Sequence, residues 1–277
     1  MQLAFHGATT MTSNLETDVR VSAQAGYRAL ELWAAKIDVF LEQHASSDLR
    51  RLLEAHGVTP TAINSIEFIA FRGDEFEQIK ARCHRLCAIA QAIGCPAVAV
   101  IPSPAPAWNS PWEMIVEEHV CALRELSDVA AEYGVKLAFE FIGYGGFSVR
   151  TPRGAWEIIR RAERDNIGMV IDVAHFFAGG GLLEELDSID PDRIYAFHLD
   201  DVPDIPKEAY SDALRLLPGL GVAPVDELCA RLAAIGYDGP CSIELFRPEY
   251  WEWDPLELAV RAREAALRVL SPHFVVV

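Results

Sequence analysis

Glycine recurs directly after helix-like stretches and just before short apolar runs, at a fairly regular spacing along the chain. The residue that follows a helix often adopts a left-handed backbone conformation, in which the side chain of most other residues would clash. Each such glycine therefore predicts the end of a helix and the start of a strand, so the chain is expected to consist of βα units. The junction glycines, mostly roughly 30 to 40 residues apart, are Gly26, Gly57, Gly94, Gly134 and Gly236.

The spacing of these junctions leaves room for eight strands. Two further junctions fit between Gly134 and Gly236, at residues 164–166 and 190–192. Eight strands that alternate with helices close naturally into a parallel (β/α)8 barrel, the TIM barrel, which usually has about 250 residues. The sequence therefore predicts an α/β fold with one TIM-barrel domain over residues 1–277. An open doubly wound sheet is the alternative, but no GxGxxG motif follows the first strand. The strands are expected to begin near Leu3, Ala29, Thr59, Ala97, Lys136, Gly168, Ile194 and Ser242.

Helical periodicity is clearest over residues 77–93 and 113–133, where apolar residues recur every three or four positions. The segment from Ser110 to Glu113 is typical of a capping box with proline in the first turn. Thr151-Pro152 and Asp254-Pro255 are expected to begin helices in the same way.

The formal net charge of −17 argues against a protein that binds nucleic acid or an anionic membrane surface. No apolar run is long enough to span a bilayer, and the first residues lack the pattern of a signal peptide. The six cysteines form no CxxC pair, which favours reduced thiols over a metal site or disulfides. We therefore expect a cytoplasmic protein that acts on a small molecule, and a homo-oligomer is compatible with the sequence.

Four successive predicted strands each end in one ionisable residue among apolar neighbours. Catalytic groups of TIM barrels lie at the carboxyl ends of the strands, and strand side chains alternate between the two faces. This alternation predicts that all four ionisable side chains face the barrel axis, while Tyr195, Phe197 and Leu199 face the helices. The four residues are Glu140, Asp172, His198 and Glu244.

Three carboxylates that are buried together require a cation to neutralise them. Taken singly, a carboxylate at a strand end more often caps a helix or forms a salt bridge. Four such groups that converge on one point favour a metal centre. Three carboxylates and one imidazole suit Mn²⁺, Mg²⁺, Co²⁺ or Zn²⁺.

Several segments resemble the xylose isomerase-like barrels, also described as the sugar phosphate isomerase/epimerase superfamily, and the resemblance covers nearly the whole chain. The most specific segment is Glu244–Tyr250, which is similar to the branch that isomerises keto-inositols. The matching segments are Phe5–Thr10, Gly134–Phe141, Arg164–Gly168, His198–Asp201 and Glu244–Tyr250.

The resemblance implies a TIM barrel with one divalent metal ion held by Glu140, Asp172, His198 and Glu244. The expected ion is Mn²⁺, with Zn²⁺, Co²⁺ and Mg²⁺ as the alternatives. It implies an isomerase or epimerase that acts through an enediolate on a ketose or inosose, with Glu140 and Glu244 as the acid–base pair. The expected reaction converts 2-keto-myo-inositol to 1-keto-D-chiro-inositol in inositol catabolism. A metal-dependent dehydratase of inosose or 3-dehydroshikimate, a lyase of the same fold, remains the alternative. An endonuclease of this superfamily is disfavoured because strands three and four end in Asn64 and Pro102, where that enzyme has histidines.

The expected substrate-binding residues are His175, Arg247, Trp33 and His6. The resemblance places His175 against substrate oxygens, although a structural histidine is an equal alternative. Arg247 either binds a substrate oxygen, orients Glu244 or forms a salt bridge at the rim. His6 and Trp33 end the first two strands and depart from the keto-inositol branch. The loops at residues 144–148 and 203–217 also differ, so the substrate stays open.

Overall fold

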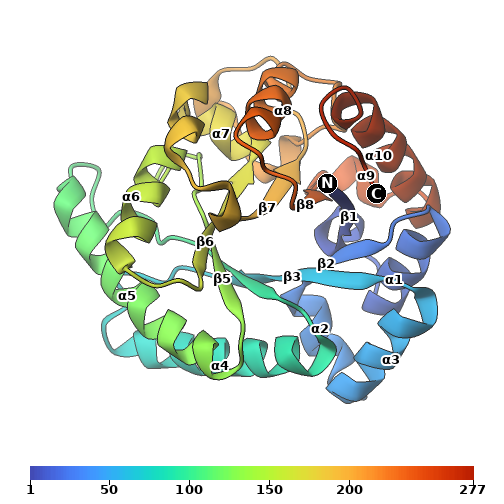
Figure 1. Cartoon of the computed structure of the whole chain (residues 1–277), viewed down its shortest axis with the longest axis horizontal. Helices are drawn as coiled ribbons and strands as arrows, with labels where there is room; N and C mark the ends of the chain where they lie inside the picture. Colours follow the sequence, from blue (N-terminus) through green and yellow to red (C-terminus); the bar gives the residue numbers. More distant parts are fainter.

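Eight parallel strands form a closed barrel in sequence order, with the last strand paired to the first, in the computed structural model of residues 1–277 (Figure 1). The predicted TIM barrel is confirmed, and each predicted strand start lies within two residues of the observed one. The strands are β1 (Gln2–His6), β2 (Ala29–Trp33), β3 (Thr59–Ile66), β4 (Ala97–Val100), β5 (Lys136–Glu140), β6 (Ile167–Asp172), β7 (Ile194–Leu199) and β8 (Pro240–Ile243).

Helices surround the strands on the outside of the barrel (Figure 1). The two helices with the clearest periodicity, α4 and α5, have the predicted bounds to within one residue. The α-helices are α1 (Leu15–Gln24), α2 (Ala34–Phe40), α3 (Ser46–His56), α4 (Phe76–Ile93), α5 (Trp112–Glu132), α6 (Pro152–Ala162), α7 (Val173–Gly179), α8 (Val225–Ala234), α9 (Pro248–Trp251) and α10 (Pro255–Leu270). Short 3-10 helices are η1 (Gly7–Thr10), η2 (Gly73–Glu75), η3 (Leu183–Ser188), η4 (Pro191–Arg193), η5 (Lys207–Ala209) and η6 (Asp212–Leu214).

The glycines after the helices have the left-handed conformation that their positions predict. Gly57 and Gly94 directly follow α3 and α4 with φ angles of 63° and 74°, and the other three junction glycines also have positive φ. These residues let the chain leave each helix and enter the next strand without strain.

Two of the three predicted helix starts are confirmed. The side chain of Thr151 accepts from the backbone N–H of Gly154, and that of Asp254 accepts from Leu256 and Glu257. The prediction of a capping box from Ser110 to Glu113 was wrong.

The reason is that α5 begins at Trp112, so proline occupies the capping position and Ser110 lies one residue too early. The Ser110 hydroxyl instead accepts from the backbone N–H of Ala107, at 3.0 Å.

Side-chain alternation along the strands separates two apolar regions. Residues such as Phe139 and Phe197 join the main core between strands and helices, whereas Ala138, Val170 and Ala196 form a small separate cluster. Tyr195 was expected to face the helices, but it packs with that small cluster.

A register shift explains the exception at Tyr195. Met169 pairs with Ile194 and Val170 pairs with Ala196, so Tyr195 has no partner on β6. Gly168 provides the space, since a Cβ atom there would lie 2.5 Å from the Tyr195 ring.

No helix combines the length and the apolar character that crossing a membrane requires. All six cysteines are free thiols, as their spacing predicts.

Candidate metal centre

The four predicted metal ligands lie together at the carboxyl ends of β5 to β8. Glu140 and Asp172 are the last residues of β5 and β6, His198 is the penultimate residue of β7, and Glu244 directly follows β8. One ligand atom from each residue lies within 4.8 Å of the others, and none of the four side chains is more than 3% exposed. The structure therefore brings together the groups that strand alternation points to the barrel axis.

The Nδ1 atom of His198 faces all three carboxylates. It lies 3.2 Å from Glu140 Oε1, 3.2 Å from Glu244 Oε2 and 3.8 Å from Asp172 Oδ2. Glu140 Oε1 and His198 Nδ1 are buried and have no hydrogen-bond partner. Converging buried acceptors of this kind fit a divalent cation, which satisfies the lone pairs and offsets the negative charge.

The local backbone orients Asp172. Helix α7 begins directly after this residue, and Asp172 Oδ1 accepts the backbone N–H of His175 at 2.6 Å. The other carboxylate oxygen is left to point into the cluster, so one residue both caps a helix and offers a ligand atom.

Arg215 is part of the centre, although no sequence pattern singled it out. Its guanidinium group is only 1% exposed, and Nη1 lies 2.6 Å from Asp172 Oδ2, 2.6 Å from Asp200 Oδ2 and 2.8 Å from Glu244 Oε2. The Nη2 atom lies 3.2 Å from His175 Nε2. The arginine offsets part of the charge of this carboxylate cluster and holds it in place. Arg215 reaches the centre from the loop at residues 203–217. The backbone of this loop is irregular, so no periodicity in the sequence predicts where its side chains point.

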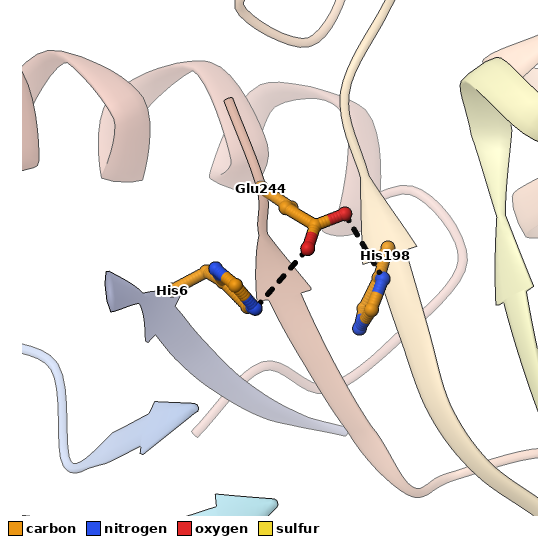
Figure 2. A group of neighbouring side chains, drawn as sticks. All are labelled: His6, His198 and Glu244. Atoms are coloured by element: carbon orange, nitrogen blue, oxygen red, sulfur yellow. Dashed lines mark ion pairs between the residues drawn. The ribbon is translucent and has the colours of Figure 1, made fainter. Parts of the chain in front are cut away.

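A second layer of polar side chains lies beneath the four ligands. Glu31 of β2 is fully buried, and both of its carboxylate oxygens lie 3.1 Å from His198 Nε2. Ser242 donates to Glu31 at 2.6 Å, and Asn64 donates at 3.3 Å. His6 Nε2 lies 3.1 Å from Glu244 Oε1, so the carboxylate of Glu244 lies between two histidines (Figure 2).

The two glutamates of the centre differ in their pKa. Burial raises the pKa of Glu140 above its usual range, and the nearby imidazole of His198 offsets only part of this effect. Burial also acts to raise the pKa of Glu244, but His198, His6 and Arg215 together outweigh it and hold that pKa below its usual range. The protein groups alone thus separate two neighbouring carboxyl groups in acidity, which suits an acid–base pair.

A cavity of about 260 Å³ opens above the ligands and is reached by Glu140, Glu244 and Arg215. Aromatic side chains form much of its wall: Trp33, Phe68, Tyr144, Phe147 and Phe246. A larger hollow of about 450 Å³ lies near α2, but none of the four ligands lines it. The smaller cavity is therefore the one that two of the candidate ligands, Glu140 and Glu244, line.

The four residues predicted to contact substrate occupy three different places. Trp33 and His175 line the cavity. His6 is fully buried beneath it, among the ligands. Arg247 lies outside the cavity lining, where it donates to the Leu214 carbonyl at 3.4 Å and pairs with Glu249 at 2.6 Å. The rim salt bridge is thus the alternative for Arg247 that matches its observed contacts.

Comparison with known proteins places this geometry in a family. The family model described as xylose isomerase-like TIM barrel matches residues 19–269. An inosose isomerase of Halalkalibacterium halodurans is 33% identical over 287 residues, which cover 99% of this chain and 98% of that protein. A 3-dehydroshikimate dehydratase of Pseudomonas aeruginosa is 24% identical over 86% of this chain and 37% of its own length. A solved structure of the IOLI protein with a binding zinc atom has a TM-score of 0.95, with 33% identity and 99% of each chain covered.

Proposed function

Because this chain belongs to the xylose isomerase-like TIM barrel family, we propose that it is a divalent-metal-dependent isomerase of a keto-inositol. The observation that carries the proposal is the convergence of Glu140, Asp172, His198 and Glu244 at the floor of an aromatic cavity. The full-length likeness to an inosose isomerase supports the substrate class. The proposed reaction interconverts 2-keto-myo-inositol and 1-keto-D-chiro-inositol, as a cytoplasmic step of inositol catabolism.

The same four residues would hold the ion. A divalent ion in this position supplies a positive charge that stabilises the negative charge developing on the substrate oxygens. We propose Mn²⁺ as the working ion, since three oxygen donors and one imidazole suit it, while Zn²⁺, Co²⁺ and Mg²⁺ are compatible with the same donors. The zinc atom in the related IOLI structure supports a divalent ion in general.

Glu140 and Glu244 would move the protons. In an α-hydroxy ketone, one carboxylate removes the proton from the hydroxyl-bearing carbon and leaves an enediolate. The other carboxyl group would then give a proton to the former carbonyl carbon, while the hydroxyl proton passes to the former carbonyl oxygen, so that the carbonyl group forms at the neighbouring position. Both glutamates line the cavity, so both can reach a bound substrate.

The remaining cavity residues would orient the ring. Arg215 presents N–H groups at the polar floor, where they can donate to substrate oxygens, and His175 Nε2 accepts from Arg215 Nη2 beside them. Trp33 and Phe246 pack against each other in a T-shaped contact, with ring centroids 5.5 Å apart, and offer an apolar surface to the carbon face of a cyclitol.

A proton NMR time course with the metal-loaded enzyme tests this function. The substrates are 2-keto-myo-inositol, 3-dehydroshikimate and simple ketoses. In D2O, proton transfer through an enediolate is expected to place deuterium at the carbon that receives the proton. Full retention of the substrate hydrogen would count against Glu140 and Glu244 as the acid–base pair. If only a simple ketose is turned over, the proposed metal centre is retained and the proposed substrate is replaced by that ketose.

A dehydratase is the second candidate, because the 3-dehydroshikimate dehydratase relative matches 86% of the chain. Removal of the same proton, followed by loss of a β-hydroxyl group as water, would need few changes in this site. The product would be conjugated and would absorb in the ultraviolet. Its appearance in the same time course would replace isomerisation with elimination.

A further inference from the structure

Glu31 takes no direct part in the proposed reaction, yet its buried carboxylate lies against His198, His6, Ser242 and Asn64. We propose that Glu31 is a positioning residue: it accepts the Nε2 proton of His198 and so presents Nδ1, unprotonated, to the metal ion. This inference rests on the metal centre of the proposed function. It adds a residue on the opposite side of the barrel that determines which histidine nitrogen is the ligand.

The two nitrogens of His198 have different surroundings. Both oxygens of Glu31 lie 3.1 Å from Nε2, whereas Nδ1 lies 3.2 Å from one oxygen each of Glu140 and Glu244. A neutral imidazole carries one N–H, and an ionised carboxylate can only accept. A nitrogen that binds a metal must be free of its proton. The ion-ligating nitrogen is therefore Nδ1, among the three carboxylates, and the proton lies on Nε2, between the oxygens of Glu31.

Glu31 is itself held in one orientation. Ser242 Oγ donates to Glu31 Oε2 at 2.6 Å, and Asn64 Nδ2 donates to Oε1 at 3.3 Å. The residue is 0% exposed, so water does not compete for these bonds. A buried acceptor with several fixed donors is rigid, and it restricts the rotation of the His198 ring.

His6 is a competing candidate ligand, because His6, His198 and Glu244 also form a group with metal-ligand spacing. The tautomer of His6 argues otherwise. Its Nδ1 accepts the backbone N–H of Ala8 at 3.0 Å, so the ring proton lies on Nε2. That Nε2–H faces Glu244 Oε1 at 3.1 Å (Figure 2) and Glu31 Oε1 at 3.5 Å. His6 Nε2 thus carries a proton that faces the carboxylates and is not free to bind an ion, so the metal ion belongs with the three carboxylates and His198.

The test compares wild type with Glu31→Gln, which keeps the shape of the side chain but removes its charge. The matched control is Ser242→Ala, which removes one donor to Glu31 and leaves the carboxylate beside His198. The dissociation constant for Zn²⁺ is measured by chelator competition, and the ring nitrogens of His198 are assigned by ¹⁵N NMR in the Zn²⁺-loaded protein. Circular dichroism and thermal unfolding of each variant show whether it is folded.

Wild type is expected to hold Zn²⁺ through Nδ1 with the proton on Nε2. Loss of such an outer carboxylate typically weakens metal binding about 10- to 100-fold, and this is the expected effect of Glu31→Gln. The Ser242→Ala control removes one hydrogen bond to Glu31 but keeps the carboxylate, so it should weaken binding less than Glu31→Gln does.

Metal binding through Nε2 in the wild type, or a folded Glu31→Gln variant that binds Zn²⁺ as tightly as wild type, would overturn the inference alone. The wild-type ring spectrum decides the matter if Glu31→Gln does not fold. A wild type that binds no divalent ion would overturn the proposed metal centre as well, so the two failures are distinguishable.

Discussion

The two halves of the barrel contribute to the centre in different ways. Strands β5 to β7 and the residue directly after β8 supply the four proposed ligands, of which Glu140 and Glu244 line the cavity. Strands β1 to β3 supply His6, Glu31 and Asn64, and the first two lie beneath the ligands and contact them. One half would perform the chemistry, and the other would set the orientation and tautomer of the groups that perform it.

This division explains how buried charge is tolerated. The ligand half holds three carboxylates and one imidazole, whereas the supporting half adds the carboxylate of Glu31 beside His198 and the imidazole of His6 beside Glu244. Asp172 and Glu244 each accept a hydrogen bond from Arg215 before any ion arrives, whereas Glu140 Oε1 has no hydrogen-bond partner and is left for the ion to neutralise. Substitutions in the ligand half should change catalysis most, and those farther from the cavity should change it least.

The largest effect is expected when the ion is removed. Dialysis against a chelator should abolish turnover, and adding back Mn²⁺ should restore it, because the enediolate charge would otherwise lack a counter-ion. Metal analysis of protein purified without chelator should find one ion per chain. Unchanged turnover in protein shown to be metal-free would mean that the reaction does not need a metal ion held by the ligand half.

Glu140→Gln and Glu244→Gln are expected to lower kcat by about 10²- to 10⁴-fold each, the usual contribution of a general acid or base. Steady-state kinetics on protein with confirmed metal content would measure this. Because glutamine retains the shape of the side chain, a folded variant with bound metal isolates proton transfer from metal binding. Wild-type turnover in either variant would contradict the acid–base assignment.

The ligand half was predictable from sequence because the position of a residue in a regular strand determines the face to which its side chain points. Glu140 and His198 each follow one apolar residue and precede another, so alternation alone points them inward. The junction glycines placed the strands, and the barrel placed their carboxyl ends together. The exception at Tyr195 arose where a register shift broke this regularity.

The supporting half was harder to predict. Glu31 lies between Leu30 and Leu32, which is the same signal that identified the ligands, but no neighbouring strand repeated it. Arg215 follows a 3-10 turn in an irregular loop, where periodicity assigns no direction to a side chain. Only the folded loop shows that its guanidinium group reaches Asp172 and Glu244.

Arg215→Lys should lower kcat/KM by roughly tenfold to 100-fold, which corresponds to the loss of one charge-assisted hydrogen bond. Lysine keeps the charge but cannot reach three carboxylates and His175 with one planar group. Metal content and thermal unfolding should be measured beside the kinetics. A metal-loaded variant with unchanged kcat/KM would show that Arg215 serves only to compensate charge.

The smallest effects are expected for His175 and Arg247, both of which the sequence predicts to contact substrate. His175 is 3% exposed, lines the cavity and lies beside Arg215, whereas Arg247 pairs with Glu249 outside the lining. His175→Ala should therefore raise KM or lower kcat by about tenfold, the value of the one hydrogen bond through which His175 holds Arg215 at the cavity. Arg247→Ala should change kcat/KM by less than about twofold, since exposed ion pairs contribute little. The two variants, assayed in parallel with the same keto-inositol, test whether the cavity boundary marks the limit of substrate contact. A larger loss for Arg247→Ala than for His175→Ala would mean that the rim of the barrel closes over the substrate and that Arg247 exchanges Glu249 for a substrate oxygen.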